Sequence, residues 1–117
     1  MAYVDGFLIA VPKNKIGDYK KLSRKAGKIW REHGALSYVE CMGDDVPEGK
    51  LTSFPRAVKL KDGETVIFSW IVYRSRRDRD AINKKVMADP RLKFDPATMP
   101  FDAKRMIFGG FKTIVEM

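Results

Sequence analysis

The stretch from Glu64 to Tyr73 is β-branched and aromatic almost throughout and is short for a buried helix. This composition predicts a central β-strand. Successive side chains of a strand point to opposite faces of its sheet, and both faces are largely apolar here. We therefore expect both faces to be covered. One face holds Val66, Phe68, Trp70 and Val72, and the other holds Ile67, Ser69, Ile71 and Tyr73.

The pattern before this strand predicts another strand followed by a helix. Residues 3–11 form the strand, which ends at Pro12 because proline lacks the amide hydrogen of a ladder bond. Apolar side chains then recur every three or four positions, which predicts an amphipathic helix over residues 15–32. Asn14 is placed to cap the start of this helix, and Gly34 to supply the left-handed residue at its end.

A second strand is predicted over residues 35–42, and a long loop follows it. Glycine, proline and charged residues punctuate residues 43–54, which is typical of a loop. Residues 56–61 are predicted as a further strand. The Asp62-Gly63 pair would join it to the central strand through a two-residue turn, and the two strands would form an inserted hairpin arm.

The rest of the chain predicts a second helix and a last strand. Ser75 and Asp78 have the spacing of a capping box, and the helix must end near Asp89 because a proline follows. Residues 90–100 are irregular in pattern, and the last strand is predicted over residues 105–115. A glycine pair within that strand indicates a bulge or a close approach of the backbone to another group.

This order of elements predicts an α+β fold, a ferredoxin-like split βαβ unit with an inserted hairpin arm. One sheet face would take the two helices. The other face is apolar, and a patch of that size is unusual on the surface of a monomer. We therefore expect residues 1–117 to form a single domain that pairs with a second copy into a dimeric α/β barrel.

Composition and charge narrow the setting and the partners. Hydrophobic residues make up 44% and charged residues 32%, as in globular proteins. The single cysteine cannot form an internal disulfide, and the apolar run near the N-terminus is shorter than the roughly 20 residues of a membrane span. We therefore expect a cytoplasmic protein with no membrane partner. The net charge of +8 favours anionic partners.

Four segments together carry a recognisable pattern: WREHGALSYVEC at residues 30–41, FSWIVYRSR at residues 68–76, VMADPR at residues 86–91 and MPFDAKRMIFGGF at residues 99–111. They resemble the YbaA-like family of small bacterial proteins of unknown function, and the resemblance covers nearly the whole chain. It implies the dimeric α/β-barrel superfamily, whose other members include monooxygenases, muconolactone isomerases and haem-dependent enzymes. It implies no established activity.

His33 and Glu40 are the candidate catalytic residues. His33 is the only histidine, and histidine is the side chain that titrates near neutrality. Its alternative role is that of a helix-terminal residue facing the negative end of the helix dipole. Glu40 shares a strand face with Tyr38, and it is a candidate acid or base if that face lines the barrel interior. If a lysine or arginine pairs with it, its role is structural.

Tyr38, Trp70, Arg74 and Arg105 are the candidate ligand-binding residues of a cavity enclosed by the two sheets. The arginines stand near strand ends, where they could hold a small anion at the cavity mouth. The alternative for Arg105 is an ion pair with Asp102, and for Trp70 a place in the core or the barrel lining. One histidine and one cysteine do not make a usual metal ligand set, and the sequence identifies no cofactor.

The outer face of the first helix supplies a second functional hypothesis, that of a basic protein associating non-specifically with RNA or another nucleic acid. No aromatic residues interleave with its cations, whereas single-strand binders stack bases on aromatic rings. A solvated face is therefore favoured. A small-molecule binder or enzyme is the leading hypothesis, and a purely structural or interaction module is the third. The cations are Lys20, Lys21, Arg24, Lys25, Lys28 and Arg31.

Overall fold

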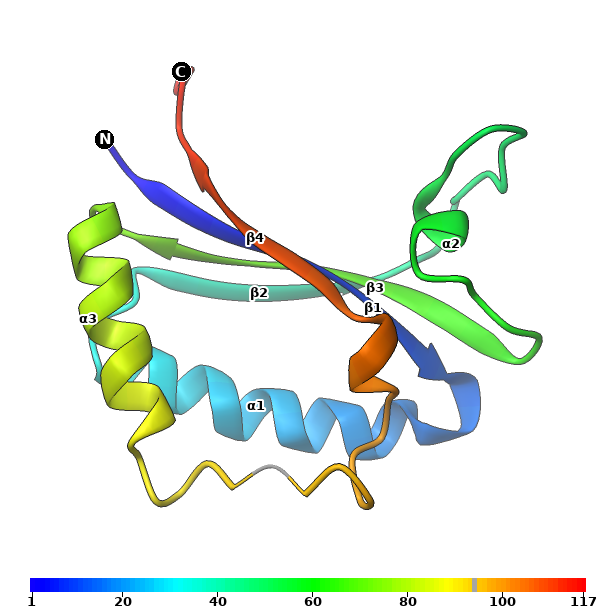
Figure 1. Cartoon of the computed structure of the whole chain (residues 1–117), viewed down its shortest axis with the longest axis horizontal. Helices are drawn as coiled ribbons and strands as arrows, with labels where there is room; N and C mark the ends of the chain where they lie inside the picture. The colour runs from blue at the N-terminus through cyan, green and yellow to red at the C-terminus, as the bar shows by residue number, and fades with distance from the viewer. Residues whose placement is uncertain (94) are drawn as a thin grey trace.

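A four-stranded antiparallel sheet with strand order β2-β3-β1-β4 forms the centre of the computed structural model, which describes residues 1–93 and 95–117. Helices α1 and α3 lie on one face of the sheet (Figure 1). This is the predicted α+β, ferredoxin-like arrangement. The strands are β1 (Tyr3–Pro12), β2 (Ser37–Met42), β3 (Glu64–Tyr73) and β4 (Ile107–Lys112), and the helices are α1 (Ile16–Glu32) and α3 (Arg76–Met87).

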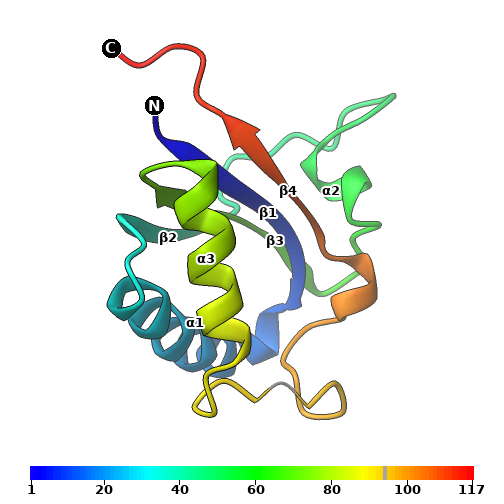
Figure 2. The same cartoon turned by 60° about the vertical axis from the view of Figure 1, so that its left-hand side comes forward.

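The core lies between the helices and the sheet face that they cover, which we call the helix face (Figure 2). β1 and β3 pair along their whole length, so that alternate residues of both strands, such as Ile9 opposite Ile67, point into this layer. Burial of one such side chain stabilises the fold by roughly 1.5–3 kcal/mol, well above any difference in local propensity. The helices contribute Tyr19, Ala26, Ile29, Ile82 and Val86.

The predicted helix ends are correct except at the start of α1. A 3-10 turn, η1 (Lys13–Lys15), precedes this helix and contains Asn14, so the prediction that Asn14 caps α1 is wrong. Gly34 has a φ of 118°, the left-handed conformation that ends a helix. Ser75 caps α3, since its Oγ accepts the Asp78 amide at 3.1 Å. No helix in the described part of the chain is long and apolar enough to cross a membrane.

The predicted strand over residues 56–61 is wrong. A short helix, α2 (Phe54–Ala57), and turns occupy this region instead. Ser53 caps α2 by accepting the Arg56 amide at 3.1 Å, and a proline stands in the first turn, where its missing amide hydrogen is not needed. The inserted segment, residues 43–63, is therefore a helical arm rather than a β-hairpin. It lies on the side of the sheet away from α1 and α3 (Figure 1).

The last strand is shorter than predicted. β4 covers six residues of the predicted 105–115, because Arg105 belongs to a 3-10 turn, η2 (Ala103–Arg105), and residues 113–117 leave the sheet. The segment predicted as irregular, residues 90–100, holds turns and no helix or strand at its described positions. Residue 94 lies outside the described residues.

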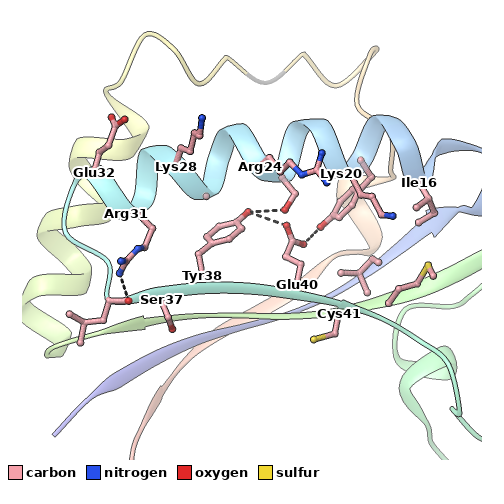
Figure 3. Close-up of a pocket in the computed structure, with 16 residues that line it drawn as sticks. Ile16, Lys20, Arg24, Lys28, Arg31, Glu32, Ser37, Tyr38, Glu40 and Cys41 are labelled. Carbon is pink, nitrogen blue, oxygen red and sulfur yellow. Dashed lines mark hydrogen bonds between the residues drawn. The ribbon is translucent and has the colours of Figure 1, made fainter.

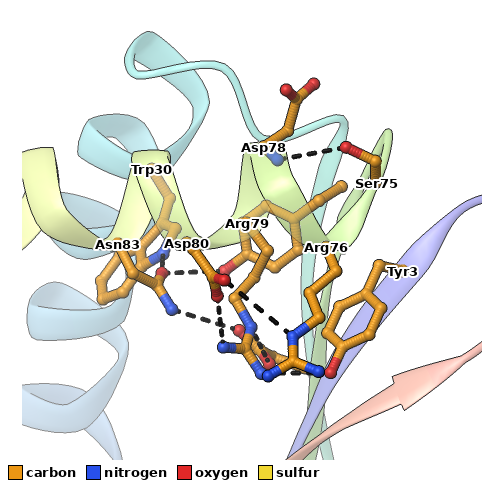
Figure 4. Close-up of polar contacts among 10 residues, drawn as sticks. Tyr3, Trp30, Ser75, Arg76, Asp78, Arg79, Asp80 and Asn83 are labelled. Atoms are coloured by element: carbon orange, nitrogen blue, oxygen red, sulfur yellow. Dashed lines mark hydrogen bonds and ion pairs between the residues drawn. The ribbon is translucent and has the colours of Figure 1, made fainter.

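Arg79 and Asn83 of α3 belong to a buried polar network (Figure 4), which joins this helix to Asp5 of β1. Arg79 Nε donates to one carboxylate oxygen of Asp5 at 3.1 Å, and Asn83 Nδ2 donates to the other at 3.4 Å. Asn83 Oδ1 in turn accepts from Trp30 Nε1 at 3.0 Å and from the Tyr73 hydroxyl at 3.1 Å. The Asp5 side chain is only 10% exposed, and a carboxylate so buried needs such partners. The network therefore fixes where α3 sits on the sheet.

Gly110 of β4 lies against this network and leaves no room for a side chain. It pairs with Asp5 in the ladder between β1 and β4. A Cβ at this position would collide with the Arg79 guanidinium and the Tyr3 hydroxyl. The close backbone approach that the sequence indicated at the glycine pair is thus confirmed at Gly110.

The face of the sheet opposite the helices is small or apolar in side chain almost throughout, and we call it the open sheet face. No helix of the described chain covers its centre, and the charged residue among its described strand positions is Glu64, at the start of β3, where Arg105 binds it. Phe111 is 61% exposed on it. The face consists of Val4, Gly6, Leu8, Ala10, Pro12, Ser37, Val39, Cys41, Glu64, Val66, Phe68, Trp70, Val72, Ile107, Gly109 and Phe111.

We predict that Gly110→Ala destabilises the protein by roughly 1–3 kcal/mol, because the added methyl group displaces Arg79 from Asp5. Gly17→Ala is the matched control, since a Cβ at Gly17 in α1 meets no atom within 4 Å. The control should be neutral or stabilising by up to about 1 kcal/mol, as expected for alanine in a helix. Urea unfolding measures both, and equal effects of the two substitutions would contradict the packing argument.

Candidate functional site

A groove of about 950 Å³ runs between α1 and the edge strand β2 (Figure 3). Ligand sites for small molecules usually have volumes of roughly 300–1,000 Å³. Tyr38 and Glu40 of β2 form the floor of the groove, and Tyr19, Ser23 and Gly27 of α1 line its wall. Of the predicted site residues, the structure brings Tyr38 and Glu40 together here.

The groove is not the cavity that the sequence led us to expect. We predicted a cavity enclosed by two sheets, with Tyr38 and Glu40 facing it. In the ladder between β2 and β3, these residues pair with Ile71 and Ser69, which are buried on the helix face. Side chains of the same parity share a face. Tyr38 and Glu40 therefore lie between sheet and helix, so the condition on which Glu40 would line the barrel interior is not met.

Hydrogen bonds from two phenols hold the Glu40 carboxyl group. The Tyr19 hydroxyl donates to Oε1, and the Tyr38 hydroxyl donates to Oε2 at 3.1 Å (Figure 3). Ser23 Oγ lies 3.5 Å from the Tyr38 hydroxyl. No lysine or arginine within residues 1–93 and 95–117 forms an ion pair with Glu40. The alternative in which Glu40 forms a structural ion pair with a lysine or arginine is therefore not observed among the described residues.

Burial determines the protonation of this cluster. It raises the pKa of Glu40 above the ordinary value, and the hydrogen bonds from Tyr19 and Tyr38 offset only part of this effect. Burial, followed by the charge of Glu40, also raises the pKa of both tyrosines. The phenols therefore stay neutral donors, and Glu40 retains a proton more readily than an exposed glutamate. A carboxyl group in this condition can donate a hydrogen bond or act as a general acid.

Sequence reasoning missed the α1 residues of the cluster. Tyr19, Ser23 and Gly27 recur every four positions, so they share one face of the helix. A Cβ at Gly27 would lie 2.8 Å from the Tyr38 ring, so the missing side chain allows the helix to approach that ring. The spacing of a tyrosine, a serine and a glycine along one helix face could have indicated this part of the cluster. The prediction instead considered the charged residues on the neighbouring face of the helix.

The basic stripe of α1 divides into two sets around the groove. Lys20, Arg24 and Lys28 line the groove, whereas Lys21 and Lys25 lie outside its lining. None of the three lining cations has a carboxylate within ion-pair distance in the described part of the chain. Their positive charge is therefore uncompensated at the mouth of the groove.

Arg31, the fourth cation of the lining, has a different role. Its Nη1 donates to the carbonyl oxygen of Ala35 at 2.9 Å and also to that of Leu36. These carbonyls belong to the connection between α1 and β2. Arg31 therefore fixes the end of the groove at which the two elements are joined.

His33 lies at the end of α1 and is not part of the groove lining. Its Nε2 lies 2.9 Å from Asp89 Oδ2, and Arg91 Nη2 binds the same oxygen at 2.8 Å. Hydrogen bonds from Arg91 and then His33 hold the pKa of Asp89 well below its usual range. His33 thus ties α1 to the segment after α3, and the structure does not bring it to Glu40.

The three remaining predicted residues lie outside the groove lining as well. Trp70 is on the open sheet face, and Arg74 is exposed directly after β3. Arg105 binds both carboxylate oxygens of Glu64 at 2.8 Å and Asp102 Oδ2 at 3.1 Å. The predicted ion pair between Asp102 and Arg105 is confirmed, and these bonds occupy the guanidinium of Arg105.

Comparison with known proteins supports the resemblance that the sequence showed. Residues 2–103 match the family model "Protein of unknown function (DUF1428)". "Uncharacterized protein YbaA" of Escherichia coli (strain K12) is 52% identical over 116 residues, which cover 99% of each chain, and the protein of the same name from Shigella flexneri matches equally.

A solved structure, "Structure of Rv0793 from Mycobacterium tuberculosis", aligns with a TM-score of 0.60 over 99% of this chain and 98% of that chain. The two chains are only 15% identical, so this likeness shows the fold alone. It supports the α+β architecture and leaves the chemistry of the groove to be argued from the residues that line it.

We predict that Glu40→Gln leaves the protein folded and changes how its stability depends on pH. The folded state binds the Glu40 proton more tightly than the unfolded chain, so the wild-type protein loses stability as pH rises above the ordinary pKa of 4.5 and through the raised value. Glutamine cannot ionise, so the variant lacks this loss. Thermal melts from about pH 4 to 7.5 measure the difference.

The melts at the acid end are the control, because there the wild-type carboxyl is protonated and the two proteins should differ least. A stability loss of roughly 3–5 kcal/mol at every pH would contradict the prediction, because that is the cost of stranding a buried cationic partner.

Proposed function

The chain belongs to the DUF1428 family of proteins of unknown function, and from its own geometry we propose that it binds a small anionic molecule in the groove between α1 and β2. One observation carries the proposal. A half-buried carboxyl group, held by two phenols and by no cation of the described chain, lies beneath helix cations that have no carboxylate partner. Such sparse, unpaired polar groups in an otherwise apolar hollow are typical of ligand sites.

The helix cations and the Glu40 carboxyl group would contact different parts of the ligand. Arg24 and Lys28 belong to the lining, and their charge attracts an anionic group through solvent. Arginine also matches a carboxylate or phosphate with paired hydrogen bonds. Ile16 and Ile67 supply apolar contact for the body of the ligand. The groove thus fits an aromatic or aliphatic molecule that carries one acidic group.

Glu40 has a defined part in this proposal. Both of its oxygens accept hydrogen bonds from phenols, and burial raises its pKa above the ordinary value. A protonated Glu40 donates a hydrogen bond to an oxygen of the ligand and is the residue positioned to act as a general acid on it. Tyr38 and Tyr19 hold the carboxyl group in place for either role.

The nucleic-acid hypothesis is the second candidate, and the cation density of α1 is the feature that favours it. The two hypotheses differ in which cations they need. The affinity of non-specific nucleic-acid binding depends on the number of phosphate groups that the protein contacts. The cations outside the groove therefore contribute as much to this affinity as those that line it. A ligand in the groove depends on the lining cations alone. Matched substitutions on the two sides of the stripe therefore separate the hypotheses.

We predict that the double substitution Arg24→Gln with Lys28→Gln weakens the binding of benzoate and salicylate roughly tenfold. Lys21→Gln with Lys25→Gln, which removes the same charge outside the groove, should change the affinity little. Benzamide is the uncharged control ligand, and neither pair should affect it. Isothermal titration calorimetry at two salt concentrations measures these affinities. An equal loss from both pairs would contradict a site in the groove.

We also propose that two copies of the chain pair through the open sheet face. The support is the composition of that face, which carries no cation at its described strand positions, and of the acidic residues only Glu64 at one end, while the whole chain has a net charge of +8. Two such faces can meet without bringing cations together. A two-fold dimer uses the same surface on both subunits, and a largely apolar face is self-complementary in this sense.

We predict a mass of about twice the 13.4 kDa of one chain by light scattering at micromolar concentration. Phe111→Asp places a charge in the open sheet face and should shift the protein towards the monomer. Met87→Asp is the matched control, because Met87 is similarly exposed but lies on α3. A wild-type mass near 13.4 kDa would overturn the proposed dimer.

A further inference from the structure

β2 is an edge strand, and every second residue along it directs its backbone groups away from the sheet. In an antiparallel pair, opposite residues alternate between those that exchange hydrogen bonds and those that do not. The Gly43 amide donates to the carbonyl oxygen of Val66 at 2.8 Å, so the odd-numbered residues of β2 are the ones bonded to β3. The amides and carbonyls of Tyr38, Glu40 and Met42 therefore face the free edge.

This free edge borders the groove between α1 and β2. Tyr38 and Glu40 line the groove from the helix face. Ser37 and Cys41 line it as well, although their side chains point to the opposite side of β2 (Figure 3). Side chains of both faces can line one groove only where it reaches around the edge of the strand. Natural sheets often block an exposed edge with lysine or proline, and β2 carries neither.

The cations that line the groove have a spacing that suits an added strand. Lys20, Arg24 and Lys28 recur every four positions along α1, so they form a row beside the groove. Four residues of a helix rise by about 6 Å. Side chains on one face of an extended chain repeat every roughly 6.6–6.8 Å. The cations are therefore spaced almost like alternate side chains of a strand that runs along β2.

The carboxyl groups of the groove leave this positive charge in place. Glu32, near the connection between α1 and β2, binds Arg91 Nη1 at 2.7 Å. Burial raises the pKa of Glu40, so this group retains a proton more readily than an exposed glutamate. The row of cations is thus complementary in charge to an acidic partner.

We infer that the ligand of the groove is an extended acidic peptide, which adds to β2 as a further strand and directs carboxylates at alternate positions towards the cations of α1. This inference rests on the proposed anion site and names its class of ligand. Main-chain hydrogen bonds to Tyr38, Glu40 and Met42 supply affinity, and the cations supply the preference for acidic residues. A small acid such as benzoate occupies one repeat of this site.

Two peptides of equal charge test the spacing. Acetyl-EVEVE-amide places its carboxylates at alternate positions, and acetyl-EEEVV-amide has the same composition with consecutive carboxylates. By isothermal titration calorimetry with the full-length chain, the alternating peptide should bind roughly tenfold more tightly. Arg24→Gln with Lys28→Gln should remove this difference, whereas Lys21→Gln with Lys25→Gln should retain it. Equal affinities of the two peptides for the wild-type protein would overturn the inference.

N-methylation of the alternating peptide tests the main-chain bonds. Amides of successive residues in a strand point to opposite edges, so only one alternate set can face β2. One variant peptide is methylated at its second and fourth amides, and the other at its third and fifth. One of them should lose roughly tenfold or more in affinity, and the other should lose little. An equal effect of the two modifications would contradict strand addition.

Hydrogen exchange measured by NMR locates the added strand. The amides of Tyr38, Glu40 and Met42 should exchange rapidly in the protein alone and slowly with saturating acetyl-EVEVE-amide. The amides of Val39 and Cys41, which belong to the residues bonded to β3, are internal controls and should be protected in both states. Protection of the edge amides without peptide would show that a second copy occupies the edge, and it would overturn the inference.

Failure of this inference is distinguishable from failure of the anion site. If benzoate binding depends on Arg24 and Lys28 while the two peptides bind equally, the site stands and strand addition is wrong. If substitution of these cations affects neither benzoate nor the alternating peptide, both proposals are wrong.

Discussion

The register between β1 and β3 is the constraint on which the rest of the structure depends. These strands pair from Tyr3 opposite Tyr73 to Pro12 opposite Glu64. A shift of one residue would exchange the two faces of a strand. It would take Asp5 away from Arg79 and place its carboxylate among the apolar side chains of the open sheet face. The register thus determines which side chains form the core, where α3 is held, and which apolar side chains form the open sheet face.

The properties of Glu40 in the groove depend on the position of β2 at the edge of the same sheet. β2 pairs only with β3 among the described strands, so one of its edges faces α1 and solvent. Glu40 is consequently buried enough for its pKa to rise, yet it remains at the edge of the molecule and near the helix cations. If the carboxyl group lay deeper in the sheet, a ligand could not reach it. If it were fully exposed, burial would not raise its pKa.

Local signals in the sequence predicted most of the elements and only part of the site. The branched and aromatic residues of 64–73 and the Ser75 cap act over short distances, so both predictions were correct. The prediction of a strand at 56–61 was wrong because it relied on the alternation of apolar residues and did not take account of the cap and the proline of α2. The contact between Tyr19 and Glu40 joins residues 21 positions apart, and it depends on the register of β2, which no local pattern determines.

Arg31 has a consequence for how the groove selects among ligands. The guanidinium of Arg31 binds carbonyl oxygens of the turn between α1 and β2, so the helix and the strand are held together at that end of the groove. Towards Ile16, at the other end, side chains join the helix to the strand. The groove therefore resembles a slot that is sealed at one end. A longer molecule can extend out of the free end, whereas a thicker one must separate the helix from the strand. Discrimination should accordingly be strict towards the girth of a ligand and lenient towards its length.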